Sequence, residues 1–442
     1  METADVVVVG GGPGGSAAAL AAAQSGALVI LLEADELLGG NAARSTGYVA
    51  FAEFEMQAEI GVEDSPEQYL ADMQAEINRQ KGRYGLIFDA DLARRYAEES
   101  AGTYRELTEL GFRFDRFLPR PVQHTVDRMV SVADTAMFTT CFESALADAG
   151  VDVRYRTRAV RLLRDGDQIS GVVTEGGPRF GAADGVVLAA GGYQANPDLR
   201  SRFQPEAQAS TPYLGTDLCR GDGHIMGSAV GGDLINMTMI PPLVMVGSAL
   251  VEDSIAVNQQ GHRFHDEAGP YDDRVAALEA QQDQQAWYVF DNRIAQAKAQ
   301  LVDEMPKPAV SGTTPAELAA AIGCDADGLA KTLDRWNQTV VSGTDRDPEF
   351  GRVIFGHPRT GIVEPPLWAA PMVVGINFPA GGFQVNADMQ VLDVFGDPIA
   401  GLYAVGDCVG GVSPAIGLGG VKITAALTLG RIAGRVAANG RR

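Results

Sequence analysis

Residues 5–20 read DVVVVGGGPGGSAAAL, and this stretch decides the fold class. A run of valines that ends in glycines is typical of a central strand of a parallel sheet, which is buried on both faces. The small residues that follow predict a helix that ends at Gly26. The next apolar run, ALVILLE at 27–33, is a second buried strand. The chain therefore opens with a β-α-β unit of an α/β fold.

The glycines of this first turn have the spacing Gly10, Gly12 and Gly15. This spacing gives a tight turn, a close approach of the backbone to a pyrophosphate, and a helix whose N-terminus faces the phosphates. Glu33 ends the second strand, where a carboxylate accepts a hydrogen bond from a ribose hydroxyl. A glycine-rich structural turn is the alternative, but the strand, helix and acid together favour a dinucleotide. An acid at this position also disfavours a 2′-phosphate.

Composition narrows the possible functions. The chain has 442 residues, 46% of them hydrophobic, and a formal net charge of −22. Such a length allows two or three domains, and the negative charge disfavours nucleic acid and anionic membrane surfaces as partners. We expect no integral membrane segment, because no run of 18 apolar residues occurs, and a cytoplasmic location, because the N-terminus has no basic region or cleavage site.

Cysteine and histidine spacing predicts no metal site. Cys141, Cys219, Cys324 and Cys408 lie far apart and form no C-x-x-C pair. The histidines also lack metal-ligand spacing, and we expect most of them at the surface or in loops. They are His124, His224, His262, His265 and His357.

Motifs along the whole chain resemble the fumarate reductase and succinate dehydrogenase flavoprotein superfamily, which includes the 3-ketosteroid dehydrogenases. The matching segments are GGGPGG at 10–15, GGNAARSTG at 39–47, LAAGG at 188–192, GHRFHDEA at 261–268 and GLYAVGDCVGGVSPAIGLGG at 401–420. The resemblance implies FAD as the cofactor. No second nucleotide fingerprint is evident, so we expect an external electron acceptor rather than a separate NAD(P)H site.

The resemblance also assigns cofactor contacts. In the family the first glycines and the acid bind the ADP half of FAD, the GGN segment lines the flavin, and the aspartate of the GLYAxGD motif bonds the ribityl chain. The start of the last helix would face a reduced, anionic flavin. The predicted contacts in this chain are Gly10, Gly12, Gly15, Glu33, Gly40, Asn41, Ser45, Gly47, Val160, Gly191, Asp407 and Gly420.

The predicted architecture is a Rossmann-type FAD-binding domain of the GR2-like class with an inserted α+β substrate or capping domain. We expect the FAD-binding domain to comprise residues 1–233 and 358–442, and the insertion to comprise residues 234–357. The insertion contains TPAE at 314–317, which is a helix capping box, and a helix with Leu329, Leu333, Trp336 and Val340 on one face.

Fumarate-reducing members of the superfamily hold their dianionic substrate with clustered cations, and this chain departs from that pattern. MIPPLVM at 239–245 has no histidine, Ser413 follows Gly-Gly-Val, and Gly417 precedes Leu-Gly-Gly. Tyr271 stands where the proton-donating arginine would be. Burying a dicarboxylate against neutral groups costs several kcal/mol per charge. Fumarate is therefore a poor substrate candidate.

The segment AGPY at 268–271 instead resembles the Ala-x-Pro-Tyr segment of ketosteroid dehydrogenases. In that group the tyrosine takes the proton next to a ketone while a hydride leaves the neighbouring carbon for the flavin. Ionising a free phenol at neutral pH costs about 4 kcal/mol, and an amide aimed at the developing enolate supplies about 3–4 kcal/mol. The resemblance makes Tyr271 the general base and the N–H of Gly420 that donor. A packed aromatic ring is the alternative for Tyr271.

Substrate size stays open. Ketosteroid enzymes bind the carbonyl with a second tyrosine where this chain has Ile416. Tyr48, Tyr193 or Tyr213 would replace it, with ordinary packing as the alternative. A smaller oxocyclohexane carboxylate, its acid paired with Arg128 or another arginine, fits as well. His265 is a candidate to assist Tyr271.

The sequence thus predicts a dehydrogenase of a cyclic ketone, either a steroid or a smaller oxocyclohexane compound. An ene-reductase that saturates an enone or unsaturated acid is the first alternative. A flavin-binding protein without turnover is the second.

Overall fold

The computed structural model describes residues 1–118, 124–205, 209–213, 215–244, 250, 252, 254–299, 302, 305, 307–356, 358–412 and 418–440. The chain divides into two compact units, Met1–Pro241 with Asn377–Arg442, and Pro242–Ile376. These boundaries differ from the predicted 234 and 357. The insertion closes on itself because β11 (Pro242–Val244) pairs with β16 (Val374–Ile376). The two strands of this pair lie more than 100 residues apart in sequence, so the local pattern does not show where the insertion ends.

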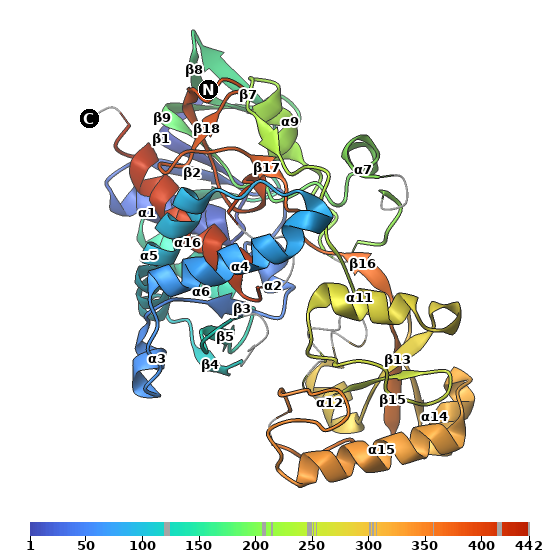
Figure 1. Cartoon of the computed structure of the whole chain (residues 1–442). Helices are drawn as coiled ribbons and strands as arrows, with labels where there is room; N and C mark the ends of the chain where they lie inside the picture. The colour runs from blue at the N-terminus through green and yellow to red at the C-terminus, as the bar shows by residue number, and fades with distance from the viewer. Residues whose placement is uncertain are drawn as a thin grey trace. The chain divides into compact units, whose positions relative to one another are not determined.

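A mainly parallel sheet forms the centre of the first unit (Figure 1). Its order is β18 (Gln390–Leu392), β19 (Pro398–Ala404), β9 (Arg179–Leu188), β1 (Glu2–Val9), β2 (Val29–Leu32) and β6 (Asp152–Arg154). β1 lies between β2 and β9 and is parallel to both, with Val6 opposite Val29 and Val7 opposite Val186. The valines of β1 are buried on both faces, which confirms the α/β fold class.

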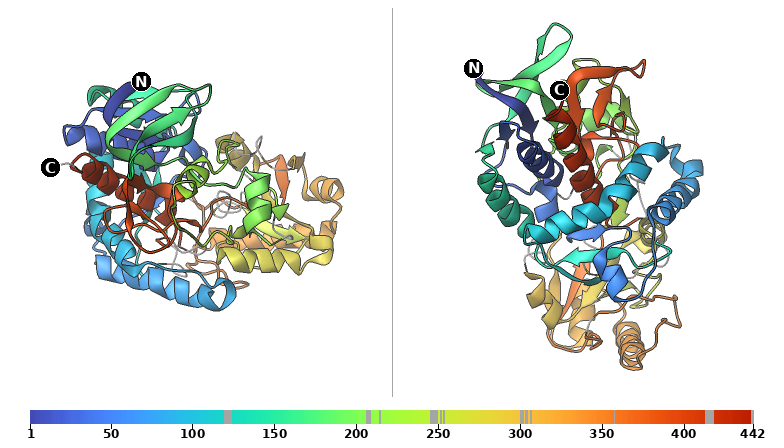
Figure 2. Two further views of the ribbon diagram at one scale, coloured as in Figure 1. Left: turned by 90° about the horizontal axis from the view of Figure 1, so that it is seen from above. Right: turned by 90° about the vertical axis from the view of Figure 1, so that its left-hand side faces the viewer.

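Helices α1 (Pro13–Gln24) and α16 (Val421–Ala437) lie side by side, as the right-hand view of Figure 2 shows. Small residues allow this close contact. A Cβ on Gly430 would come within 2.3 Å of the Gly14 carbonyl oxygen, and one on Gly434 within 2.1 Å of the Ala18 oxygen. The alanine-rich sequence of α1 therefore serves helix packing as well as the first turn.

The remaining elements of the first unit surround this sheet. The helices are α2 (Gly40–Ala43), α3 (Glu55–Glu59), α4 (Pro66–Tyr84), α5 (Ala90–Glu109), α6 (Met137–Asp148), α7 (Pro197–Phe203), α9 (Asp222–Ser228) and the short η2 (Gly406–Cys408). A second sheet has the order β3 (Tyr48–Ala50), β5 (Met129–Val132) and β4 (Phe114–Phe117). The hairpin of β7 (Ala159–Asp165) and β8 (Gln168–Thr174) extends from β9, and β10 (Leu234–Ile235) pairs with β17 (Gly382–Phe383).

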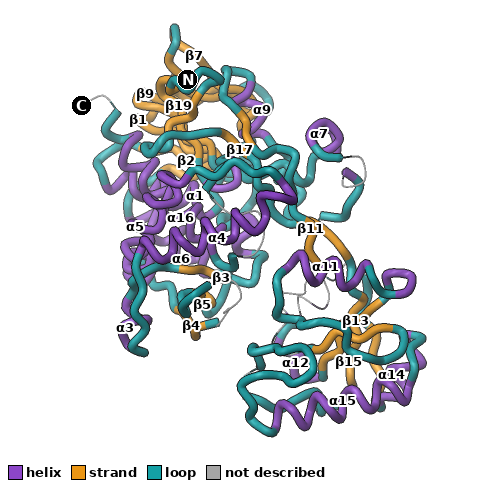
Figure 3. Tube along the Cα trace, in the orientation of Figure 1, coloured by secondary structure: helices purple, strands orange, loops and turns teal. Residues whose placement is uncertain are grey.

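The second unit has an antiparallel sheet of β12 (Ile255–Asn258), β13 (Ala286–Phe290), β15 (Leu367–Pro371) and β14 (Val310–Gly312). Its helices are α11 (Tyr271–Glu279), α12 (Asn292–Ala297), α14 (Pro315–Ile322) and α15 (Ala326–Val341) (Figure 3). The N-cap half of the predicted capping box is present, since Thr314 Oγ1 accepts a hydrogen bond of 3.2 Å from the Glu317 amide. The Glu317 carboxylate accepts at 2.8 Å from the Thr313 amide rather than from that of Thr314. The predicted apolar face of α15 is buried against this sheet.

None of the described helices combines the length and the apolar character that crossing a bilayer requires. No group of three or more histidine, cysteine or acidic side chains in the described part of the chain is arranged to hold a metal ion.

Candidate active site

The first turn is built from glycines with two different roles. Gly10 has a φ of +103°, and a Cβ there would lie 2.4 Å from the Ala189 carbonyl oxygen. A Cβ on Gly15 would lie 1.8 Å from the Gly10 oxygen, so both residues are glycine for packing reasons. Gly12 differs, because its φ is −68° and a Cβ there would meet nothing within 4 Å. The space beside Gly12 is therefore open to a bound group.

Glu33 lies at the end of β2, as predicted, and its carboxylate contacts the glycine turn. Oε2 accepts a hydrogen bond of 2.6 Å from the Gly11 amide, and Oε1 accepts one of 2.7 Å from the Asp35 amide. Burial raises the pKa of this carboxyl above its ordinary value, and the two amides partly oppose that effect. The acid is thus held beside the N-terminus of α1, where a ribose hydroxyl would meet it.

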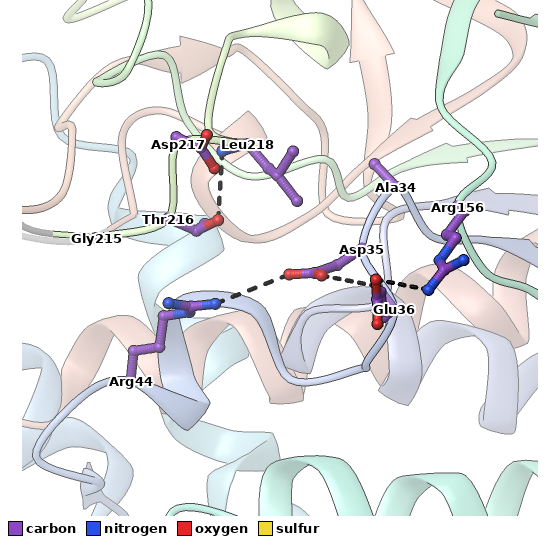
Figure 4. Close-up of a pocket in the computed structure, with 9 residues that line it drawn as sticks. All are labelled: Ala34, Asp35, Glu36, Arg44, Arg156, Gly215, Thr216, Asp217 and Leu218. Carbon is purple, nitrogen blue, oxygen red and sulfur yellow. Dashed lines mark hydrogen bonds and ion pairs between the residues drawn. The ribbon is translucent and has the colours of Figure 1, made fainter. Parts of the chain in front are cut away.

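A polar pocket of about 540 Å³ follows Glu33 in the first unit (Figure 4). Two ion pairs cross its wall, Arg44 with Asp35 at 4.0 Å and Arg156 with Glu36 at 2.6 Å. The lining residues are Ala34, Asp35, Glu36, Arg44, Arg156, Gly215, Thr216, Asp217 and Leu218. Its position at the end of β2 is that expected for the adenosine half of a dinucleotide.

Val160 lies apart from these contacts in β7, where 44% of the residue is exposed. Its place among the cofactor residues stays a prediction.

The GGN segment lies against the glycine turn. The Gly39 amide donates to the Gly11 oxygen at 2.9 Å, and a Cβ on Gly40 would lie 3.5 Å from the Gly12 Cα atom. Asn41 reaches the other way, because its Nδ2 donates to the Tyr213 hydroxyl at 3.0 Å and its Oδ1 accepts from the Thr216 amide at 3.0 Å. The segment therefore joins the turn to Tyr213 and to Thr216, and Thr216 lines the pocket.

Ser45 and Gly47 shape the end of this segment. The Ser45 hydroxyl donates to the Ala42 oxygen at 2.8 Å and accepts from the Gly47 amide at 3.0 Å. Gly47 has a φ of +69°. A direct role of Ser45 toward the flavin remains a prediction.

Gly191 and Asp407 lie close together although they are far apart in sequence. Gly191 follows β9, and its carbonyl oxygen accepts a hydrogen bond of 3.4 Å from the Cys408 thiol. Asp407 pairs with Lys422, in the first turn of α16, at 3.5 Å between Oδ1 and Nζ. The GLYAxGD motif is thus held at the N-terminus of the last helix.

Gly420 is the N-cap of α16 and has a φ of +82° with no side-chain cap. A Cβ there would lie 2.7 Å from the Val49 carbonyl carbon, so the backbone passes directly over β3. Within the described part of the chain, the Gly420 amide donates no hydrogen bond. Ser413, Ile416 and Gly417, which carry the predicted departures from the family pattern, lie outside the described residues.

Together these features define a dinucleotide-binding α/β protein. The uncapped N-terminus of α1, the open space at Gly12, the acid at the end of β2 and the polar pocket all fit the ADP half of the cofactor.

A family model described as an FAD binding domain matches residues 5–423. The chain belongs to this family of FAD-dependent oxidoreductases, and the predicted cofactor is confirmed.

Curated relatives agree with this assignment. A probable fumarate reductase of Shewanella frigidimarina is 31% identical over 434 residues, which cover 92% of this chain and 70% of the relative. A 4-oxocyclohexanecarboxylate 2-dehydrogenase of Sinomonas cyclohexanicum is 27% identical over 462 residues, which cover 91% of this chain and 79% of the relative.

Solved structures with the same fold include the open conformation of a flavocytochrome c3 fumarate reductase. It has a TM-score of 0.77 and 28% identity, covering 99% of this chain and 78% of that one. A 3-ketosteroid-Δ4-(5α)-dehydrogenase of Rhodococcus jostii has a TM-score of 0.69 and 24% identity, covering 99% of this chain and 97% of that one. The chain is thus an FAD-dependent oxidoreductase of a family that acts on CH–CH groups.

Tyr271 is the first residue of α11 in the second unit and follows Pro270, the N-cap. Its ring is half-buried, and the Arg274 guanidinium lies over it at 4.8 Å from the ring centre. The Arg274 Nε donates to the Gly269 oxygen at 2.8 Å, which fixes the Gly-Pro turn. Among the described residues, none hydrogen-bonds the Tyr271 hydroxyl. That hydroxyl is therefore uncommitted within the part of the chain that the structure describes.

His265 does not hydrogen-bond Tyr271 in the described structure. It is buried, its ring lies 4.6 Å from that of Phe264, and burial lowers its pKa to about 4. Among the described residues, neither ring nitrogen of His265 has a hydrogen-bond partner.

The expectation that Arg128 pairs with a substrate carboxylate is wrong. Arg128 is fully buried and its nitrogens are already occupied. Nε and Nη2 donate to Asp64 at 3.0 and 2.7 Å, and Nη1 donates to Asp72. The sequence could not show this, because the partners lie on other elements of the chain.

Replacing Arg128 with alanine is expected to cost about 3–5 kcal/mol of unfolding free energy, because two buried carboxylates lose their partner. Urea unfolding monitored by circular dichroism measures this. The matched control is Arg94→Ala, which breaks an exposed pair with Asp91 and is expected to cost less than about 0.5 kcal/mol. Equal losses of unfolding free energy in the two variants would contradict the burial of Arg128 with its two aspartates.

The candidate tyrosines have structural partners. Tyr193 is fully buried and its hydroxyl donates to the Met237 oxygen, which supports the packing alternative. Tyr213 accepts from Asn41 and so helps to fix the GGN segment. Tyr48 is half-buried at the start of β3.

The expected placement at the surface or in loops holds for His124, His262 and His265, which lie in loops, and fails for His224, which is buried within α9. Burial of two of the loop histidines was not expected. His124, His224 and His265 are 3%, 1% and 9% exposed. His262 is exposed, and His357 lies outside the described residues. Isolated histidines in a polar stretch carry no signal of burial, and the group that contacts His124 is 295 residues away.

The buried histidines predict that stability falls in mild acid. Burial lowers the pKa of His124, His224 and His265 to about 4, against an ordinary value of 6.5. Between these values the unfolded chain binds more protons than the folded one, so the free energy of unfolding decreases as the pH falls from about 6.5 to 4. Urea unfolding at pH 7.5 and pH 5 should show this decrease.

The free energy of unfolding differs between pH 7.5 and pH 5, and His224→Gln is expected to reduce this difference by about 2 kcal/mol. The exposed His262→Gln is the control and should leave the difference unchanged. A His224→Gln protein with the full pH dependence would refute this explanation.

Proposed function

We propose that the protein dehydrogenates a cyclic ketone of the oxocyclohexane type at its α and β carbons. Tyr271 takes the α proton, and the Gly420 amide donates to the carbonyl oxygen as negative charge develops on it. FAD supplies the acceptor for the hydride that leaves the β carbon. The electrons then pass to an external acceptor. A relative named as a 4-oxocyclohexanecarboxylate 2-dehydrogenase, which matches 91% of this chain, supports this substrate class.

The observation that carries the proposal is the uncommitted Gly420 amide at the N-cap of α16. An amide at the start of a helix donates most favourably to an oxygen that gains charge. Tyr271 supplies the matching base in place of the arginine expected for fumarate reduction. Because two aspartates already pair with Arg128, a group other than Arg128 binds the carboxylate of an oxocyclohexane acid in this proposal.

Reduction of an unsaturated compound is the second candidate, since several relatives are named as reductases. An anaerobic panel separates the two directions. The oxidised enzyme is mixed with 4-oxocyclohexanecarboxylate, cyclohexanone and 4-androstene-3,17-dione, and the dithionite-reduced enzyme with cyclohexenone, fumarate and urocanate. We expect bleaching of the flavin absorbance by the saturated oxocyclohexane acid. Reoxidation by fumarate or urocanate, with no bleaching by any ketone, would reject the proposal.

A further inference from the structure

A buried histidine holds the peptide group that carries the proposed oxyanion donor. His124 is 3% exposed, and its Nε2 lies 2.9 Å from the Gly419 carbonyl oxygen. The Gly419 carbonyl and the Gly420 N–H belong to the same peptide group. Because this group is planar and trans, an anchor on the oxygen also sets the direction in which the N–H points.

The neighbours of His124 determine which nitrogen carries its proton. Arg128 Nη1 faces His124 Nδ1 at 3.5 Å, at the long limit of a hydrogen bond. An arginine has only donors, so Nδ1 must be the acceptor. The neutral ring then has its hydrogen on Nε2 and donates to the Gly419 oxygen.

The ring stays neutral in its surroundings. Burial and then the positive charge of Arg128 lower the pKa of His124 to about 4. The groups that face it are Arg128, Asp64 and Asp72, with the Tyr69 ring at 6.0 Å between centres. Asp64 and Asp72 hold Arg128 in place. A chain of contacts therefore runs from the two acids through Arg128 and His124 to the Gly419 carbonyl.

The other side of Gly420 is fixed as well. Thr424 Oγ1 donates to the Gly420 oxygen at 3.0 Å and accepts from the Ala50 amide at 3.0 Å. Both carbonyls around the Gly420 amide are thus engaged, while that amide donates to no described residue. A carbonyl that accepts a hydrogen bond polarises its peptide group, which strengthens the N–H as a donor.

We propose that His124 is a positioning residue, which orients and polarises the Gly419–Gly420 peptide so that its amide binds the oxygen of an enolate. The inference rests on the proposed function, because it assigns His124 to the donor named there. His124 itself touches no reacting atom in this scheme.

Two ligands separate an oxyanion effect from a general effect on the site. 4-Hydroxybenzoate, as its phenolate, resembles the enolate of 4-oxocyclohexanecarboxylate. Cyclohexanecarboxylate has the same acid group and no ring oxygen. The dissociation constants of both are measured by equilibrium dialysis with the FAD-loaded enzyme, in the wild type, His124→Phe and His124→Gln.

We expect His124→Phe to weaken phenolate binding about tenfold or more, and to change cyclohexanecarboxylate binding less than about twofold. His124→Gln retains an amide donor and is expected to restore part of the phenolate affinity. Thermal unfolding and FAD content are recorded for each variant. If His124→Phe does not fold, His124→Gln is compared with the wild type instead. We then expect an intermediate loss of affinity for the phenolate and no comparable loss for cyclohexanecarboxylate.

The outcomes distinguish this inference from the proposed function. If the variants lose affinity equally for both ligands, or for neither, the role of His124 is overturned. The proposed ketone dehydrogenase activity still stands in that case if the substrate bleaches the flavin absorbance of the wild type. A wild type that does not prefer the phenolate over cyclohexanecarboxylate has no oxyanion donor. That result would overturn both the role of His124 and the proposed function.

Discussion

Replacement of Tyr271 with phenylalanine is expected to slow anaerobic flavin reduction by 4-oxocyclohexanecarboxylate by about 10²- to 10⁴-fold, the range for loss of a general base. The phenylalanine ring can still stack beneath Arg274, whose guanidinium lies 4.8 Å from the centre of the tyrosine ring. The hydrogen bond from Arg274 to the Gly269 oxygen, which fixes the turn, does not involve the hydroxyl that is removed. Only the proton acceptor is lost. The decay of flavin absorbance in a stopped-flow experiment measures the rate constant directly.

The chain offers a matched control for this substitution. Tyr288 lies in β13 of the same unit, is fully buried, and its hydroxyl has no hydrogen-bond partner among the described residues. Tyr288→Phe therefore removes the same atom without breaking a described hydrogen bond, and the rate of flavin reduction should stay within about twofold of the wild type. A Tyr271→Phe enzyme that reduces its flavin at the rate of this control would remove the base from the mechanism.

Local sequence signals predicted the parts of the fold that depend on local physics. The valines of β1, the glycine turn and the small residues of α1 act through neighbours in sequence, so their pattern is visible before folding. The same holds for the Thr314 cap and for the apolar face of α15. Each of these elements appears where the pattern placed it.

Contacts between distant segments could not be predicted in this way. Arg128 and His124 look like ordinary polar loop residues, and their burial depends on Asp64, Asp72 and the Gly419 carbonyl. The domain boundary failed for a similar reason, since only the pairing of β11 with β16 shows where the insertion closes. The role proposed for His124 therefore has no signal in the sequence around it.

Gly12→Ala is expected to raise the dissociation constant for FAD about 100-fold or more while the apoprotein loses less than about 1 kcal/mol. Nothing in the described part of the chain requires glycine there, since the φ of −68° suits any residue and a Cβ would meet nothing within 4 Å. The space beside it is needed only if a pyrophosphate approaches the backbone closely. Titration of the apoprotein with FAD, followed by flavin fluorescence, and urea unfolding of the same sample measure the two quantities.

Two further glycines separate a cofactor effect from a structural one. Gly15→Ala places a Cβ 1.8 Å from the Gly10 oxygen, so it should destabilise the apoprotein itself, and FAD binding is lost as a consequence. Gly102→Ala lies within α5, where a Cβ would meet only the Arg431 side chain at 3.4 Å, and should leave FAD affinity unchanged. If Gly12→Ala binds FAD as tightly as Gly102→Ala does, the pyrophosphate does not pass over Gly12. The open space there would then need another explanation, because packing among the described residues gives none.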